Sequence, residues 1–336
     1  MNINAPLIIS GDKEYAYATG LVRGKWAKRL GRSEFQRLIE TAPDEINKTL
    51  SELGFTGADK DPERALRDEW EQTISLVESV SRDPEITDLF RLFIDFTNAA
   101  MVLKSELFNF DPKLFYIDVG KTDLESLQKV ASGEGHHKSV PPRVREAMLT
   151  AKALYKSIQI PLVIDVAADS YFLTVMANVL QNSKRIFLRE FASRWLDSNN
   201  LTSYLRIRKS GISLEHFKRF FVDGGHLTRK YFREFENLEL DSIPSRLVYS
   251  VYGKPLADAV TRLVRKDDFE PLSTYFKGML ESFLRQNIYI SFGVEVVFAY
   301  AMLKKSELEA VGAIVRMKKA LIDKETIHQR VRHDDL

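Results

Sequence analysis

Residues 197–209 read Asp197-Ser-Asn-Asn200-Leu-Thr-Ser-Tyr-Leu205-Arg206-Ile-Arg208-Lys209. An acid and an asparagine lie three residues apart, an apolar residue follows eight after the acid, and the stretch ends in bases. Upstream, apolar residues continue at steps close to the helical period. One apolar stripe would then run along a helix. We therefore predict a long amphipathic helix over Leu173–Ile207.

The same order of side chains occurs in two further stretches. The first is Asp95-Phe-Thr-Asn98, which leads to Leu103 and Lys104, and the second is Glu307-Leu-Glu-Ala310, which leads to Val315, Arg316, Lys318 and Lys319. Both lie in predicted long helices, Ile86–Leu107 and Val294–Leu321. Acids early and bases late are favoured in any helix by its dipole. An Asp–Asn pair inside an apolar helix, present twice, nevertheless favours a true internal repeat.

The expected organisation follows from these three helices. We predict helical repeat 1 over residues 1–118, a linker and entry to repeat 2 over residues 119–142, repeat 2 over residues 143–211, and repeat 3 over residues 212–336. Strand-like runs are few and isolated: Pro6–Ile9, Leu114–Val119 and Pro161–Val166. For each run, a buried loop or the start of a helix is favoured over a strand. The prediction is an all-α protein.

Composition excludes several classes of function. The chain has 336 residues, 44% of them hydrophobic and 29% charged, as in globular proteins. Its 49 Lys and Arg residues nearly balance 47 Asp and Glu residues, which argues against a nucleic-acid partner. The absence of cysteine excludes disulfides and thiolate chemistry. Apolar runs such as Ile160–Val166 are shorter than a spanning helix needs, and we expect a soluble chain without a signal peptide.

No complete catalytic or ligand-binding motif is present. Gly20–Trp26 and Gly120-Lys121-Thr122 are incomplete versions of the phosphate-binding loop. The six histidines, which include the adjacent His136 and His137, have no spacing typical of metal ligands. The acidic pairs Asp267-Asp268 and Asp334-Asp335 look like solvated turns or ends. We expect no cofactor, no metal site and no catalytic residue.

Two further stretches complete a resemblance to a known family. The opening helix reads Tyr15-Ala-Tyr17-Ala-Thr-Gly-Leu-Val-Arg23, and the closing helix begins Phe292-Gly293-Val-Glu295-Val-Val-Phe-Ala-Tyr300. With the two Asp–x–x–Asn signatures, they make the chain similar to the C subunits of bacterial and archaeal V/A-type ATPases, which are related to the d subunits of eukaryotic vacuolar ATPases. The chain departs from the family pattern at Val294 and Val296, where proline is usual.

The resemblance implies three similar helical bundles arranged as a pseudo-threefold funnel. In that family the funnel sits on the membrane proteolipid ring and holds the foot of the central rotor shaft. The chain would then be a non-catalytic, peripheral subunit at the cytoplasmic face of the membrane, in an ATPase that transports protons or sodium ions. A helical-repeat scaffold of an unrelated complex is the alternative, and an enzyme is a third.

Two sets of residues are candidates for contacts. The polar pairs, Asp95 with Asn98 and Asp197 with Asn200, either bond the backbone of a neighbouring bundle and so fix how the helices cross, or contact the shaft. Glu307 is the acid of the third copy. The basic helix ends either balance the helix dipole or face an acidic rotor partner; they are Arg206, Arg208, Lys209, Arg316, Lys318 and Lys319.

Overall fold

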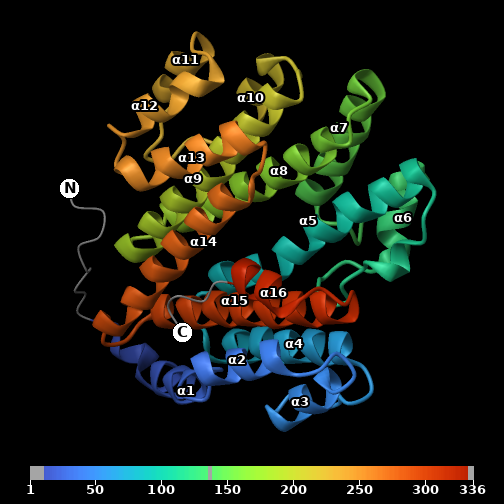
Figure 1. The fold of residues 1–336 in the computed structure, drawn as a ribbon, viewed down its shortest axis with the longest axis vertical. Coiled ribbons are helices and arrows are strands. Elements are labelled where there is room, and N and C mark those ends of the chain that lie inside the picture. Colours follow the sequence, from blue (N-terminus) through green and yellow to red (C-terminus); the bar gives the residue numbers. More distant parts are fainter. Residues whose placement is uncertain (1–10, 135–137, 332–336) are drawn as a thin grey trace. The chain divides into compact units, whose positions relative to one another are not determined.

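The computed structural model describes residues 11–134 and 138–331, which fold into helices joined by turns and loops (Figure 1). No β-strand occurs in these ranges, and the all-α prediction is confirmed. The α-helices are α1 (Ala16–Trp26), α2 (Arg32–Glu40), α3 (Ile46–Glu52), α4 (Pro62–Val80), α5 (Pro84–Phe108), α6 (Leu124–Ser132), α7 (Pro142–Ile158), α8 (Leu162–Gln181), α9 (Ile186–Lys209), α10 (Leu214–Phe220), α11 (Arg229–Glu236), α12 (Ile243–Leu247), α13 (Gly253–Lys266), α14 (Glu270–Arg285), α15 (Val294–Lys319) and α16 (Lys324–Arg330). The 3-10 helices are η1 (Lys13–Tyr15), η2 (Pro112–Leu114), η3 (Leu240–Ser242) and η4 (Gln286–Tyr289).

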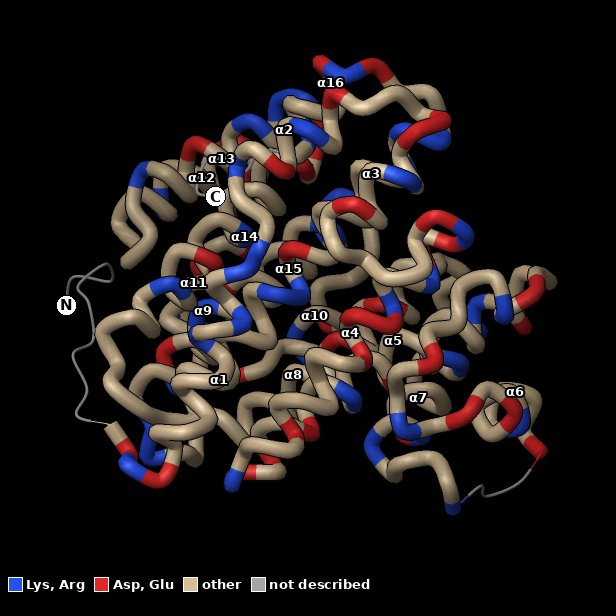
Figure 2. The backbone as a smooth tube through the Cα atoms, turned by 90° about the horizontal axis from the view of Figure 1, so that it is seen from below, with Lys and Arg blue, Asp and Glu red and all other residues tan. Residues whose placement is uncertain are grey.

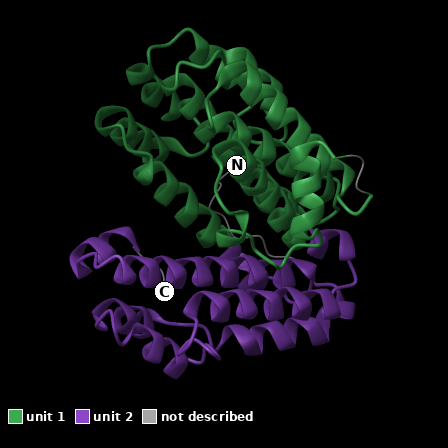
Figure 3. Ribbon diagram, turned by 90° about the vertical axis from the view of Figure 1, so that its right-hand side faces the viewer, with its two compact units in different colours: residues 1–7, 89–283 green, residues 8–88, 284–336 purple. Residues whose placement is uncertain are grey.

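The chain forms two compact units (Figure 3). The middle unit holds Leu89–Phe283, and the terminal unit holds residues 11–88 and 284–331 of the described chain. The boundary near residue 88 falls within α5. The segment expected as repeat 3, residues 212–336, is divided between the two units.

In the terminal unit, α15 is the central helix. It packs against α4, α1 and α2 (Figure 1). Its buried residues occur on several sides of the helix, among them Val297, Ala301, Val311 and Val315. A helix that is apolar on several sides is stable only when neighbours surround it. This packing explains why the end of the chain joins its beginning in one core.

In the middle unit, α9 packs between α8 and α10. Rings from α9, α10 and α11 form an aromatic core. The ring of Tyr204 lies 5.0 Å from that of Phe217 and 5.4 Å from that of Phe232. Inclined ring contacts at these distances add to the stabilisation from burial. This core fixes the half of α9 that follows Asn200.

Two of the three predicted long helices are confirmed, and one was wrong. The helices α5 and α15 match the predicted ranges to within a few residues. The predicted helix Leu173–Ile207 is instead two helices, because α8 ends at Gln181 and α9 starts at Ile186. Ser183 shapes the turn between them, where its Oγ accepts from the N–H of Arg185 at 3.0 Å. The four residues between the two helices, Asn182–Arg185, are all polar and interrupt the apolar stripe.

The strand-like runs became other structures. Residues 114–119 form the end of η2 and a loop. Residues 161–166 are the N-cap and the first five residues of α8, and Pro6–Ile9 lies outside the described residues. The helix α8 runs for 20 residues and is, by length and composition, the one described helix apolar enough to cross a membrane. Half of its most apolar stretch is buried in the protein. It packs against α7 and α9, as a core helix does. The apolar run Ile160–Val166 is therefore only the beginning of a longer apolar helix.

Candidate functional site

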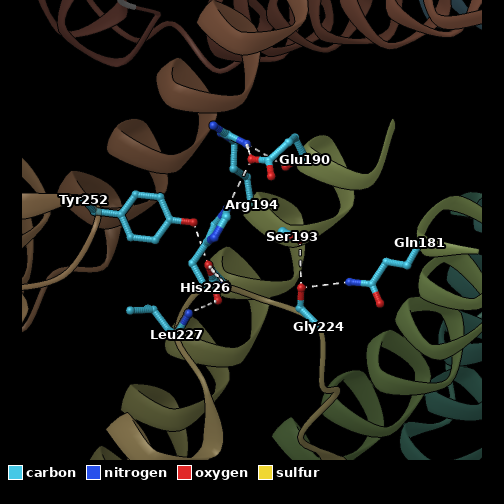
Figure 4. A network of polar contacts seen from close by, with 9 residues as sticks. Gln181, Glu190, Ser193, Arg194, Gly224, His226, Leu227 and Tyr252 are labelled. Atoms are coloured by element: carbon cyan, nitrogen blue, oxygen red, sulfur yellow. Dashed lines mark hydrogen bonds and ion pairs between the residues drawn. The ribbon is translucent and has the colours of Figure 1, made fainter. Parts of the chain in front are cut away.

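Asp197 on α9 is fully buried and holds the loop that follows α10. Its carboxylate accepts hydrogen bonds from the backbone N–H of His226 (2.8 Å) and Leu227 (2.8 Å) and from the hydroxyl of Tyr252 (2.6 Å). Figure 4 shows Tyr252, His226 and Leu227 converging on this point. A carboxylate that accepts several donors fixes their positions strongly, because each bond is charge-assisted.

Asn200, one turn further along α9, holds the start of the same loop. Its Nδ2 donates to the carbonyl of Val222 (2.8 Å), and its Oδ1 accepts from the N–H of Val222 (3.2 Å). One amide side chain therefore pairs with both backbone groups of one residue. Buried backbone groups need such partners. Asp197 and Asn200 together clamp residues 222–227 onto α9.

The pair on α5 makes the same bonds to the loop before α6. Asn98 Nδ2 donates to the carbonyl of Ile117 (2.7 Å), and its Oδ1 accepts from the N–H of Ile117 (3.0 Å). Asp95 Oδ1 accepts from the N–H of Lys121 (2.9 Å) and Thr122 (3.0 Å). All four side chains of the two clamps are buried. Buried and already bonded, they are not available to a partner.

The two clamped loops correspond residue by residue. In each, the asparagine holds the first residue of a six-residue segment, and the aspartate holds the fifth and sixth: Ile117–Thr122 and Val222–Leu227. The fourth residue is glycine in both, Gly120 and Gly225. A Cβ on either would collide with the Oδ1 of the clamping aspartate. The glycine is therefore part of the clamp.

A second set of contacts supports the α9 clamp. The carbonyl of Gly224 accepts from Gln181 Nε2 and from Ser193 Oγ, both at 2.8 Å (Figure 4). Glu190 Oε2 pairs with Arg194 Nη1 at 2.6 Å and lies 3.5 Å from His226 Nε2. The loop is thus attached to both α8 and α9.

Burial governs the ionisation of the clamp. Desolvation raises the pKa of Asp95, and it raises the pKa of Asp197 to about 6 against the opposing effect of the donated hydrogen bonds. Burial, followed by the nearby Asp197, raises the pKa of Tyr252, so its hydroxyl stays protonated and donates. Burial likewise lowers the pKa of His226. Burial is the first cause of each of these shifts.

The third acid, Glu307 on α15, is also buried and bonded to a loop. Its Oε2 accepts from the N–H of Leu30 (3.3 Å), and its Oε1 accepts from Lys304 Nζ (2.7 Å). Ala310 stands where the other copies have asparagine, so the two-way amide pair is missing. The loop it holds, between α1 and α2, comes from the start of the chain. The buried acid is shared by the three helices, but the full clamp occurs on α5 and α9.

The basic helix ends divide into bonded and exposed residues. Arg208 donates to the carbonyls of Phe235 (3.0 Å) and Leu238 (2.9 Å), and Lys209 pairs with Asp267. Arg206 is exposed, with its guanidinium 5.4 Å from the ring centre of Phe269.

On α15, Lys318 is buried and donates to the carbonyl of Ile39, and burial lowers its pKa. Lys319 is exposed and lies 3.6 Å from Glu63. Arg316 is exposed as well. Arg206 and Arg316 are therefore the members of the predicted set most open to a partner.

The two incomplete phosphate-binding motifs form a helix and a clamped loop. Residues 20–26 lie within α1, and residues 120–122 are part of the α5 clamp. The amides that might have held a phosphate there already bond Asp95. Within residues 11–134 and 138–331, no group of three or more possible metal ligands occurs. His136, His137, His333 and Asp334-Asp335 lie outside the described residues.

Comparison with known proteins decides the family. A family model described as ATP synthase (C/AC39) subunit matches residues 18–330. The chain belongs to this family. It is the family that the sequence resembles, and the match covers both clamps and the helices α5, α9 and α15.

Individual members of the C/AC39 family share little identity with the chain. The C subunit of the A-type ATP synthase of Pyrococcus furiosus is 22% identical over 332 residues, covering 90% of this chain and 86% of the relative. The Pyrococcus abyssi protein of that name is 21% identical over 343 residues, covering 94% and 90%. That of Halobacterium salinarum is 27% identical over 159 residues, covering 45% and 43%. The likeness extends over nearly the whole chain in two of the three.

The two loops held by the α5 and α9 clamps were not predicted from the sequence. A signal for them was present, because Ile117-Asp-Val-Gly120 and Val222-Asp-Gly-Gly225 share their first, second and fourth positions in character. The two loops lie 19 and 22 residues after their asparagines. A three-residue difference in spacing hides the repeat from a search in fixed register.

Proposed function

We propose that the chain is a non-catalytic adaptor in the central stalk of a rotary V/A-type ATPase. It would join the central rotor shaft to the membrane proteolipid ring, as a peripheral subunit at the cytoplasmic face, and so couple ATP turnover to transport of protons or sodium ions. The observation that carries the proposal is the family match over residues 18–330. Relatives named as C subunits of A-type ATP synthases cover most of the chain.

We further propose that the repeats form three helical bundles in a pseudo-threefold funnel, with the boundaries expected from the sequence. The same clamp on α5 and α9 supports repetition of the first two. The buried Glu307 on α15 supports a third, modified copy. An adaptor that transmits torque needs loops that keep their shape, and buried carboxylates bonded to backbone N–H groups supply that rigidity.

Arg206 and Arg316 are the proposed contacts to the shaft. Both are exposed near the C-terminal ends of long helices. Basic side chains on such a surface steer an acidic partner and make docking sensitive to salt. Arg208, Lys209 and Lys318 are bonded within their own units, so we assign them to folding, and Lys319 remains a weaker candidate.

Affinity purification tests the proposal. A tagged full-length chain, isolated from mild detergent extracts of its own membranes, should bring down ATPase catalytic subunits, shaft subunits and proteolipid in fixed ratio. The purified chain alone should show no ATP hydrolysis. A helical-repeat scaffold of an unrelated complex predicts a different set of partners. Recovery of the chain without any ATPase subunit contradicts the adaptor function.

A further inference from the structure

The N-terminal helix and the turn after it carry an excess of positive charge. Residues 15–33 contain no Asp or Glu and five bases: Arg23, Lys25, Lys28, Arg29 and Arg32. All five are exposed. Acidic and basic residues are interspersed along most of the backbone (Figure 2), and the whole chain has a net charge of +2. We call these five residues the basic surface.

The basic surface is not neutralised by the rest of the described chain. None of its five residues forms an ion pair with residues 11–134 or 138–331. Arg23 donates to the carbonyl of Ile290 at 2.6 Å, and Arg29 lies 5.1 Å from the ring centre of Trp26. Neither contact removes charge. Five uncompensated charges within ten residues create a local positive potential that attracts an anionic partner.

Exposed aromatic and aliphatic side chains lie beside these charges. Tyr17 on α1 is 77% exposed, and Ile288 and Tyr289 on η4 are 68% and 49% exposed. The η4 turn is held against α1 by the Arg23 bond to Ile290 and by the N–H of Gly293, which lies 3.4 Å from Thr19 Oγ1. In the terminal unit, most of the exposed large apolar side chains therefore gather at the basic surface.

The outer face of α1 is open. Ala18 and Val22 are buried on its inner side. Gly20 and Gly24, one turn apart on the other side, are exposed, and a Cβ on either would meet no atom within 4 Å. Because the apolar side of α1 is buried in the protein, the helix can lie on a surface but cannot insert deeply into it.

We propose that the basic surface docks onto an anionic phospholipid surface. Clusters of about four to eight Lys and Arg residues bind acidic lipid head groups, and the five bases of the basic surface fall within this range. Tyrosine prefers the boundary between lipid and water, where Tyr17 and Tyr289 would lie. Protein interfaces are also rich in tyrosine and arginine, so an acidic protein surface is the competing partner, and the experiments below distinguish it from lipid. This contact goes beyond the adaptor function, because it involves lipid rather than another protein of the complex.

Vesicle binding by the isolated full-length chain tests the proposal. The chain should sediment with phosphatidylglycerol vesicles at low salt and not with phosphatidylcholine vesicles. Replacing two bases in Lys25→Gln/Lys28→Gln should lower the partition coefficient roughly 30-fold, the loss expected for two surface charges. Tyr17→Ser should weaken binding further without changing the salt dependence.

A matched variant separates a defined surface from net charge. Lys48 and Lys60 are exposed and lie in the same unit but outside the basic surface. Lys48→Gln/Lys60→Gln removes the same charge and should change binding less than threefold. No sedimentation with phosphatidylglycerol, or equal losses in the two double variants, overturns the proposal. Unchanged vesicle binding by the Lys25/Lys28 variant, combined with its loss from the purified ATPase, would assign the surface to an acidic protein instead.

Discussion

Replacing Gly225 by alanine perturbs the α9 clamp at its most crowded point. The added Cβ would collide with Asp197 Oδ1 and lie 2.8 Å from Asp197 Cγ. The carboxylate cannot turn away cheaply, because three donors hold it. Gly225 is not among the residues with positive φ, so the effect arises from contact rather than from backbone strain. The loop must move outward.

The size of the effect follows from the bonds that the movement breaks. The N–H groups of His226 and Leu227 each donate to the carboxylate at 2.8 Å. A hydrogen bond to a charged group contributes roughly 1.5–3 kcal/mol. The reduced freedom of the unfolded chain returns roughly 0.4–1 kcal/mol, so we expect a net loss of about 3 kcal/mol. For a unit of this size, the melting temperature should fall by roughly 6–12 °C.

Urea unfolding followed by tryptophan fluorescence measures this loss. Trp195 lies on α9 in the middle unit, and the other two tryptophans, Trp26 and Trp70, lie in the terminal unit. With those two replaced by phenylalanine, the signal reports the middle unit alone. The control is Gly278→Ala on α14, where a Cβ meets no atom within 4 Å and a helical alanine should stabilise by roughly 0.5–1 kcal/mol. If Gly225→Ala unfolds at the same urea concentration as this control, the clamp does not hold the loop.

Three further outcomes follow. Burial raises the pKa of Asp197 to about 6, so its contribution to stability is present below about pH 4 and is lost as the pH rises through 6. Between these pH values the unfolding free energy should fall by about 3 kcal/mol, and this fall should be absent in Asp197→Asn. Asn200→Ala leaves both backbone groups of the clamped residue unpaired and should cost about 2 kcal/mol or more, whereas the neighbouring Asn199→Ala should cost under about 1 kcal/mol; equal losses in urea unfolding would contradict the clamp. Arg206→Glu combined with Arg316→Glu should keep the circular dichroism of the folded chain yet release the rotor shaft during purification, and normal retention of the shaft would exclude these two residues as the contact.

Helix positions were predictable where apolar periodicity was continuous. The helices α5 and α15 were placed to within a few residues, and α15 continues through a run of four polar residues, Lys304-Lys305-Ser306-Glu307. The stripe over Leu173–Ile207 contains the polar run Asn182-Ser-Lys-Arg185, which ends one helix before the next begins. Periodicity on both sides of the break matched, so pattern alone could not show it.

The side chains that form the clamps were predictable from the sequence, but the loops that they bond were not. Asp95 and Asn98 were expected to need partners because a polar pair in a packing helix is costly when unpaired. Their partner, the backbone of a loop about twenty residues later, is a tertiary contact that leaves little trace in the sequence. The glycine at the fourth position of each loop is a visible trace of this contact in the sequence. The reason for the glycine, the nearby carboxylate, is seen only in the folded structure.

The role of the basic helix ends could not be read from sequence either. Arg206 and Arg208 lie two residues apart on one helix, yet Arg206 is exposed and Arg208 bonds two backbone carbonyls. Lys318 is buried although lysine is nearly always exposed. Which base reaches solvent depends on the elements packed beside each helix end, and chain order does not specify these.

ATP-driven ion transport in membrane vesicles tests the adaptor function most directly. Vesicles prepared from cells that lack the chain should retain the proteolipid ring but neither bind the catalytic head nor transport ions. Adding back the purified full-length chain with the head should restore both binding and transport. If vesicles without the chain bind the head and transport ions at the normal rate per ATP hydrolysed, the chain does not join shaft to ring.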